Sequence, residues 1–82
     1  MNEIKLTIAD DHPIFLKGLL DVISEDNSLD IISSATDGEQ VLSQILTSQP
    51  AIAILDINMP GLTGFEVVKK LCEKKSATKI IF

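Results

Sequence analysis

The sequence has no tryptophan, no tyrosine, no arginine and a single cysteine among its 82 residues. With three phenylalanines as the only aromatic residues, its core must consist mainly of isoleucine, leucine, valine and alanine. One cysteine cannot form a disulfide within the chain, and such sparing use fits a reducing compartment. No apolar stretch approaches the roughly 20 residues that a membrane-spanning helix needs. We therefore expect a soluble, cytoplasmic protein without a membrane partner.

Positive charge is also scarce. The seven basic residues are all lysines, and the formal net charge is -5. An acidic chain without a basic stripe repels the phosphate backbone of a nucleic acid, so contact with DNA would need a different domain. The length and the 45% content of hydrophobic residues suffice for one small domain.

Strand and helix patterns alternate along the chain. Period-two alternation over residues 4–9 predicts a strand, and apolar residues at helical spacing after Pro13 predict a helix. The same order repeats twice, and a last strand follows. The predicted strands are 4–9, 31–35, 51–55 and 79–82, and the predicted helices are 13–23, 38–49 and 63–72. This alternation with short connections predicts an α/β fold with a mostly parallel sheet and helices on both faces.

The second and third predicted helices carry capping signals at their N-termini. Asp37 can cap the second helix, with Gln40 placed for the reciprocal bond, and Thr63 with Glu66 forms a capping box for the third. The apolar face of the third helix is predicted to consist of Phe65, Val68, Leu71 and Cys72.

Acidic residues end two of the predicted strands. Asp10 and Asp11 follow the first, and Asp56 follows the third, which is apolar throughout and therefore expected to be covered on both faces. Parallel strands end at one edge of a sheet and neighbours lie about 4.8 Å apart, so adjacent strands would bring these carboxylates together. Two like charges near 5 Å repel by roughly 3 kcal/mol at an effective dielectric of about 20. The cluster therefore calls for a cation, and oxygen ligands beside a phosphate suit Mg²⁺.

A simpler explanation exists for part of this pattern. An Asp pair before a helix is by itself more often a cap with a favourable charge at the helix dipole. An acid that ends a buried apolar strand lacks that explanation, because a charge beside the core is costly without a partner. The two features together favour a binding site.

Two motifs resemble the receiver domain of bacterial two-component response regulators. Residues 8–13, Ile-Ala-Asp-Asp-His-Pro, are similar to the start of that domain, and residues 54–64, with the pattern D-x-N-M-P-G-x-x-G, are similar to its phosphorylation-site loop. The resemblance covers the whole chain and implies a flavodoxin-like fold with strand order 2-1-3-4-5. Asp-Asp-His-Pro also resembles the receivers that are joined to a LuxR-type helix-turn-helix output domain.

The resemblance implies a role for each acidic residue. Asp56 would accept a phosphoryl group from a sensor histidine kinase or a phosphotransfer protein. Asp11, Asp56 and the backbone carbonyl of Asn58 would bind Mg²⁺, with Asp10 acting through a metal-bound water. His12 would cap the first helix and would not donate a phosphoryl group. The domain would control a transcriptional output domain, and no turnover of a small molecule is expected.

The given chain ends within the fourth predicted strand. A full receiver continues with a Ser or Thr at the end of that strand, another helix, a fifth strand ending in a Lys, and a last helix. We therefore expect residues 1–82 to be an incomplete receiver domain with a partly bare sheet face and an open edge strand. Both features favour self-association.

Three other functions fit parts of the pattern. A haloacid dehalogenase-like phosphohydrolase also places a nucleophilic Asp after an apolar strand, but it usually has a second Asp where this chain has Asn58. A pseudo-receiver would act through protein contacts without phosphate, which the intact set of Asp10, Asp11 and Asp56 opposes. A flavodoxin-like nucleotide binder needs a Gly-rich or Ser/Thr-rich cradle after the first strand, where this chain is acidic.

Overall fold

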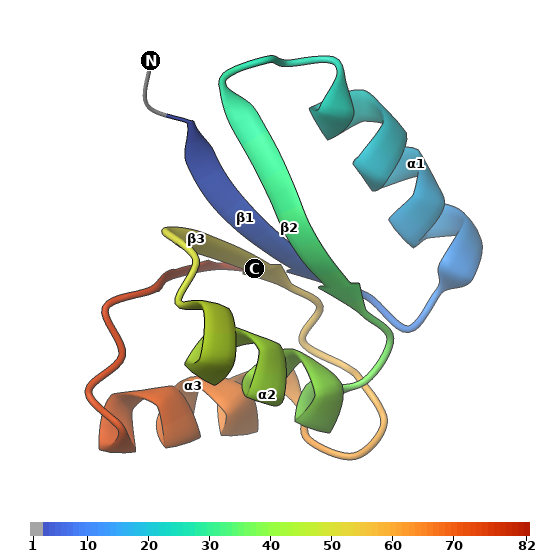
Figure 1. The fold of residues 1–82 in the computed structure, drawn as a ribbon. Helices are drawn as coiled ribbons and strands as arrows, with labels where there is room; N and C mark the ends of the chain where they lie inside the picture. The colour runs from blue at the N-terminus through green and yellow to red at the C-terminus, as the bar shows by residue number, and fades with distance from the viewer. Residues whose placement is uncertain (1–2) are drawn as a thin grey trace.

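A computed structural model describes residues 3–82, in which strands and helices alternate as predicted (Figure 1). The elements are β1 (Ile4–Ala9), α1 (Pro13–Ser24), β2 (Leu29–Ala35), α2 (Gly38–Ser48), β3 (Ile52–Leu55), α3 (Gly64–Glu73) and β4 (Lys79–Ile81). Strand β2 begins two residues earlier than the sequence pattern indicated, and β3 begins one residue later. The predicted α/β class is confirmed.

The sheet has the order β2-β1-β3-β4, and each neighbouring pair is parallel. This agrees with the order that the family resemblance implied. Strand β1 lies between β2 and β3, and its last residue, Ala9, pairs with Leu55 at the end of β3. The residues that follow these two strands therefore emerge side by side at the same edge of the sheet.

Helix α1 lies on one face of the sheet, and α2 and α3 lie together on the other (Figure 1). Alternate residues of each strand point to opposite faces, so both faces of β1 are buried, with Leu6 and Ile8 on one side and Thr7 and Ala9 on the other. The larger core lies between the sheet and the α2–α3 layer. Its buried members are Ala9, Ala35, Val41, Ile45, Ala53, Leu55, Met59, Val67 and Leu71.

The inward face of α3 differs from the prediction. Val67 and Leu71 are buried, whereas Phe65 and Cys72 are exposed and Val68 is half-buried. Positions 67 and 71 are one helical repeat apart and point toward α2 and the sheet. The prediction was right for Leu71, but it missed Val67 and chose Phe65 and Cys72, which are hydrophobic by type and yet lie on the exposed side.

The predicted helix caps are present, with one change of partner. Thr63 Oγ1 accepts from the Glu66 N–H at 3.2 Å, and Glu66 Oε1 accepts from the Thr63 N–H at 3.0 Å, which completes the capping box. At α2, Asp37 Oδ1 accepts from the Gln40 N–H at 2.7 Å. The Gln40 side chain, however, accepts from the N–H of Thr36 at 3.2 Å and not from that of Asp37. Each cap fixes the point where a loop at the carboxyl edge gives way to a helix.

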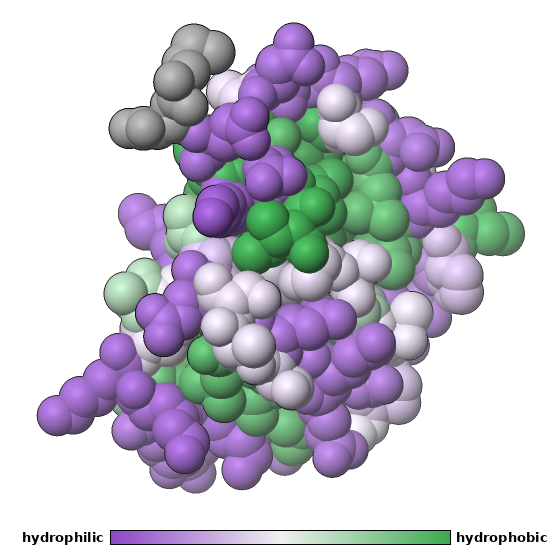
Figure 2. All heavy atoms as spheres, in the orientation of Figure 1, coloured by the Kyte–Doolittle hydropathy of each residue, from purple (hydrophilic) through white to green (hydrophobic). Residues whose placement is uncertain are grey.

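Part of the sheet face that carries α1 is left uncovered. Helix α1 contacts β1 and β2, while Ile54 of β3 pairs with Ile81 of β4 beyond it. An open cleft of about 320 Å³ lies there, with Phe15, Leu19 and Phe82 among its apolar lining residues. In the view of Figure 2, too, hydrophobic residues reach the surface in patches between hydrophilic ones.

Candidate functional site

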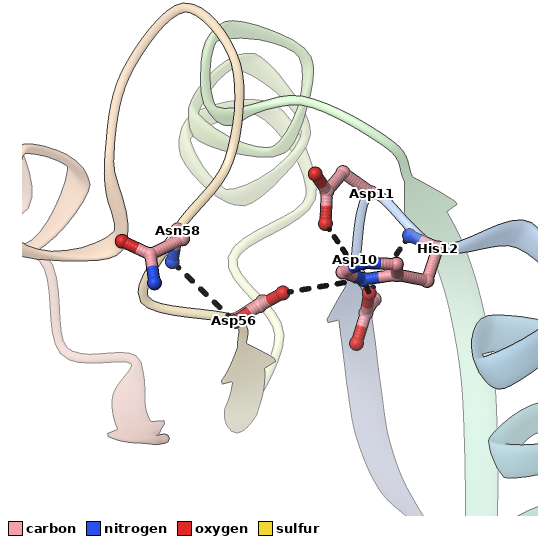
Figure 3. A network of polar contacts seen from close by, with 5 residues as sticks. All are labelled: Asp10, Asp11, His12, Asp56 and Asn58. Atoms are coloured by element: carbon pink, nitrogen blue, oxygen red, sulfur yellow. Dashed lines mark hydrogen bonds and ion pairs between the residues drawn. The ribbon is translucent and has the colours of Figure 1, made fainter.

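Four polar residues meet at the carboxyl edge of the sheet (Figure 3). The Asp10 N–H donates to the Ala35 carbonyl at 3.1 Å, and the Asp56 N–H donates to the Ala9 carbonyl at 3.0 Å. These bonds extend the ladder beyond the ends of the strands and hold the two acidic residues in register. One side-chain ligand atom each from Asp10, Asp11, His12 and Asp56 lies within 4.8 Å of the others. The acids that the sequence placed on neighbouring strands do converge.

The three carboxylates differ in environment. Asp10 is buried, and its Oδ1 accepts hydrogen bonds from the backbone N–H of His12 at 2.9 Å and from His12 Nδ1 at 3.0 Å. Asp11 is half-buried, and its enclosed Oδ1 has no hydrogen-bond partner among residues 3–82. Asp56 is half-buried as well, and its Oδ1 accepts only a long bond, 3.4 Å, from the Asn58 N–H.

His12 belongs to this cluster, which the sequence did not indicate. It occupies the N-cap position of α1, but its side chain makes no capping hydrogen bond. The ring turns instead toward the acids, with Nδ1 2.9 Å from Asp11 Oδ1 and 3.9 Å from Asp56 Oδ2. The hydrogen bond with Asp10, followed by the charge of Asp11, raises the pKa of the imidazole above its ordinary value. The available signal was that this histidine directly follows two acids.

The cluster is chemically suited to a metal cation. Its donors are carboxylate oxygens, which hard divalent cations prefer. The Asp11 oxygen lies 2.9 Å from His12 Nδ1 but is not hydrogen-bonded by it, so a buried acceptor remains unsatisfied. Buried acceptors of this kind call for an explanation such as a bound ion. Asp10, Asp11, His12 and Asp56 could therefore hold a metal ion.

The loop after Asp56 is shaped by close backbone contacts. The Gly38 N–H at the start of α2 donates to the Pro60 carbonyl at 3.2 Å. Gly61 has φ +78°, a conformation that glycine adopts at little cost. A Cβ on Gly64 would lie 2.7 Å from the Asp56 carbonyl oxygen, so only glycine fits there without a shift. Met59, 6% exposed, inserts into the core. The motif residues thus hold this loop tightly beside the acids.

The family described as the response regulator receiver domain matches residues 6–82 of the chain. The chain belongs to this family. The receiver domain is similar to the nitrate/nitrite response regulator protein NarL of Escherichia coli K12, with 33% identity over 76 residues. That match covers 93% of this chain and 35% of the relative. The receiver domain thus spans about a third of the length of a curated relative of this kind.

Solved structures give the same result. The signal receiver domain of the response regulator NarL from Mycobacterium tuberculosis superposes with a TM-score of 0.94 at 29% identity, over 98% of this chain and 64% of that one. A DNA-binding response regulator of the LuxR family from Staphylococcus aureus superposes with a TM-score of 0.89 at 28% identity, over 94% of this chain and 64% of that one. The predicted similarity to LuxR-type regulators is confirmed among these relatives.

The comparisons favour a receiver over the alternative functions considered from the sequence. Both the sequence family and the structural neighbours are receiver domains, and neither points to a dehalogenase-like phosphohydrolase. Within residues 3–82 of the receiver domain, every helix is too short or too polar to cross a membrane.

Proposed function

We propose that this receiver domain accepts a phosphoryl group on Asp56 in the presence of Mg²⁺. Asp11, Asp56 and the backbone carbonyl of Asn58 would hold the ion, and Asp10 would act through a metal-bound water. The observation that carries the proposal is the meeting of three carboxylates at one edge of the sheet, with an unsatisfied buried oxygen on Asp11. When bound, the ion would offset the charge that builds up on the carboxylate and on the transferred group.

The environments of the acids support Asp56 as the acceptor. Asp10 is buried, and one of its oxygens is bound twice by His12. The side chain of Asp56 is 27% exposed, and among residues 3–82 it accepts only the long hydrogen bond from Asn58. Asp11 is similarly exposed, at 32%, so Asp56 is preferred to it because Asp56 begins the loop that resembles the family's phosphorylation site. Attack on phosphorus forms the acyl phosphate O–P bond and breaks the P–N bond of a donor phosphohistidine, and the neutral imidazole leaves with a proton from solvent.

The partners follow from this chemistry. We propose a sensor histidine kinase or a phosphotransfer protein as the donor, because each presents phosphohistidine. A transcriptional output domain would carry out any contact with DNA, since this acidic chain itself repels a nucleic acid. The one cysteine and the lack of a membrane-spanning helix in the described part of the chain support a cytoplasmic location.

Labelling with a small phosphodonor tests the proposed function. The chain is mixed with an acyl phosphate and Mg²⁺, and its intact mass is measured over time. We expect the gain of one phosphoryl group, dependent on Mg²⁺, without sustained hydrolysis of a phosphate ester. Repeated turnover of such an ester would favour the phosphohydrolase instead, and no gain of mass at all would count against the acceptor role.

Magnesium should stabilise the folded domain, because the acids converge only when the sheet is formed. At ten times the dissociation constant, binding adds about 1.4 kcal/mol to the free energy of unfolding. Thermal unfolding followed by circular dichroism across a Mg²⁺ series measures this effect. Asp11→Asn should abolish the Mg²⁺-dependent rise in melting temperature, whereas Asp21→Asn, at an exposed site on α1, should keep it. An equal rise in both variants would place the ion elsewhere.

We also propose that the chain alone associates with a second copy of itself. Exposed apolar side chains form a strip across α1, the uncovered sheet face and the start of α3. They are Ile14, Phe15, Val22, Ile57, Phe65, Ile81 and Phe82. Phe15 lines both the cleft that contains Ile57 and Phe82 and a second one along α1 that contains Ile14 and Val22. The rings of Phe65 and Phe82 lie 5.3 Å apart, so the strip is continuous. Large aromatic and aliphatic side chains of this kind dominate the energetics of standard interfaces, to which each partner contributes about 800 Å².

Substitutions on the strip test this association. Phe15→Glu places a charge in the interface and should weaken self-association about 30-fold or more. Thr47→Glu, on the exposed face of α2, changes the charge equally and should leave association unchanged. Because two chains of charge -5 repel, association should strengthen with salt. Sedimentation equilibrium measures all three effects, and a monomer at high concentration and high salt would contradict the proposal.

A further inference from the structure

The proposed function assigns roles to three acids and leaves His12 without one. Its Nδ1 lies 3.0 Å from Asp10 Oδ1, 2.9 Å from Asp11 Oδ1 and 3.9 Å from Asp56 Oδ2 (Figure 3). Carboxylate oxygens only accept hydrogen bonds, so Nδ1 carries a hydrogen, which it donates to Asp10 Oδ1. One ring nitrogen thus fills the space between the three carboxylates.

In the proposed site, Asp11 and Asp56 would hold the ion directly and Asp10 would bind one of its waters. Magnesium binds its oxygen ligands at about 2.0–2.1 Å and keeps several waters, so a water that joins the ion to Asp10 would lie about 3 Å from the oxygens of Asp10 and Asp11, which is where Nδ1 lies now. We propose that His12 Nδ1 takes the place of this metal-bound water in the metal-free domain, and that the ring swings out before Mg²⁺ binds. This inference rests on the proposed function, because it takes the acidic cluster to be the Mg²⁺ site.

The surroundings of His12 allow this movement. The side chain is 72% exposed, and its ring makes no hydrogen bond to the backbone of α1 as a cap would. Asp10 keeps one partner when the ring leaves, because the His12 backbone N–H still donates to Asp10 Oδ1 at 2.9 Å. The ring can therefore depart without loosening the backbone around the acids, and a His12→Ala variant should retain the cluster.

The contact with the ring stabilises only the metal-free form. The apparent dissociation constant for Mg²⁺ then equals the intrinsic constant divided by the fraction of molecules in which the ring has left the site. His12 is thus a positioning residue. It fills part of the site before the ion arrives and thereby lowers the domain's affinity for the ion.

Magnesium titrations of matched variants at one pH test this role. Since the chain lacks tryptophan and tyrosine, binding is followed by NMR of the backbone amides of the acidic cluster. His12→Ala should bind Mg²⁺ about five-fold more tightly than the unchanged chain. Lys17→Ala, which removes a full positive charge from the same helix, should change the affinity by less than about two-fold. Equal or weaker binding by His12→Ala would overturn the inference.

The ring itself provides a second measurement. The chain has one histidine, so the imidazole signals belong to His12 without further assignment. On addition of Mg²⁺ they should move toward the positions of a solvent-exposed ring. Ring signals that stay fixed while the amides of the cluster respond would overturn the inference but keep the Mg²⁺ site. If neither chain binds Mg²⁺, the proposed function fails, and this inference fails with it.

Discussion

Replacing Asp56 with Asn should abolish the gain of a phosphoryl group from a small phosphodonor. The amide cannot form the acyl phosphate, since it lacks the anionic oxygen that attacks phosphorus. The substitution should leave the fold intact, because the Asp56 N–H keeps its bond to the Ala9 carbonyl and an amide oxygen can still accept from Asn58. Intact mass after incubation with the donor and Mg²⁺ measures the effect.

A second acid at the same edge of the sheet provides the control. Asp37 caps α2 through its bond from the Gln40 N–H, and asparagine caps about as well. Asp37→Asn should therefore gain the phosphoryl group as fast as the unchanged chain. Asp10 and Asp11 are unsuitable as controls because they belong to the proposed metal site. A full gain of mass by Asp56→Asn would show that a different residue is the acceptor.

Replacing Gly38 with Ala should destabilise the domain by about 3 kcal/mol. A Cβ at this first residue of α2 would lie 1.9 Å from the backbone oxygen of Leu62 and 2.6 Å from its carbonyl carbon. Because the clashing atoms belong to the backbone and not to a flexible side chain, the whole loop after Asp56 would have to move to make room for the Cβ. Alanine is the better helix former by only about 1 kcal/mol, which is too little to offset the clash.

Gly18 is the matched control for this substitution. It lies inside α1, and a Cβ there would meet nothing within 4 Å among residues 3–82. Gly18→Ala should therefore stabilise the domain by about 0.5–1 kcal/mol. Urea unfolding followed by far-ultraviolet circular dichroism compares the two variants. Equal stabilisation by both would mean that the loop can retreat from α2 at no cost.

The sequence predicts the position of the acids because it depends on backbone regularities. Alternation of strand and helix patterns indicated a parallel sheet, and the shared carboxyl edge of parallel strands then brought the residues after β1 and β3 together. Neither step depends on how a particular side chain turns. The capping box of Thr63 and Glu66 was predictable for the same reason, since both partners are three residues apart in one helix.

Features that depend on tertiary packing or side-chain direction were not predictable. The apolar stripe of α3 was misplaced because Phe65 and Cys72 are hydrophobic by type yet exposed in the fold. The Gln40 side chain accepts from the Thr36 N–H and not from that of Asp37, a choice that depends on the direction of the side chain. His12 looked like a cap because it precedes a helix, but its ring lies against the carboxylates and makes no capping hydrogen bond.

The burial of Met59 ties the reacting edge of the sheet to the layer of helices beneath it. Met59 is three residues from Asp56 and lies in the same cluster as Val41 of α2 and Val67 of α3. Protein interiors are close-packed, so a displacement of this loop would move a side chain that packs in the same cluster as residues of both helices. A phosphoryl group on Asp56 that displaced this loop would therefore also disturb the packing of α2 and α3, away from the reacting atoms.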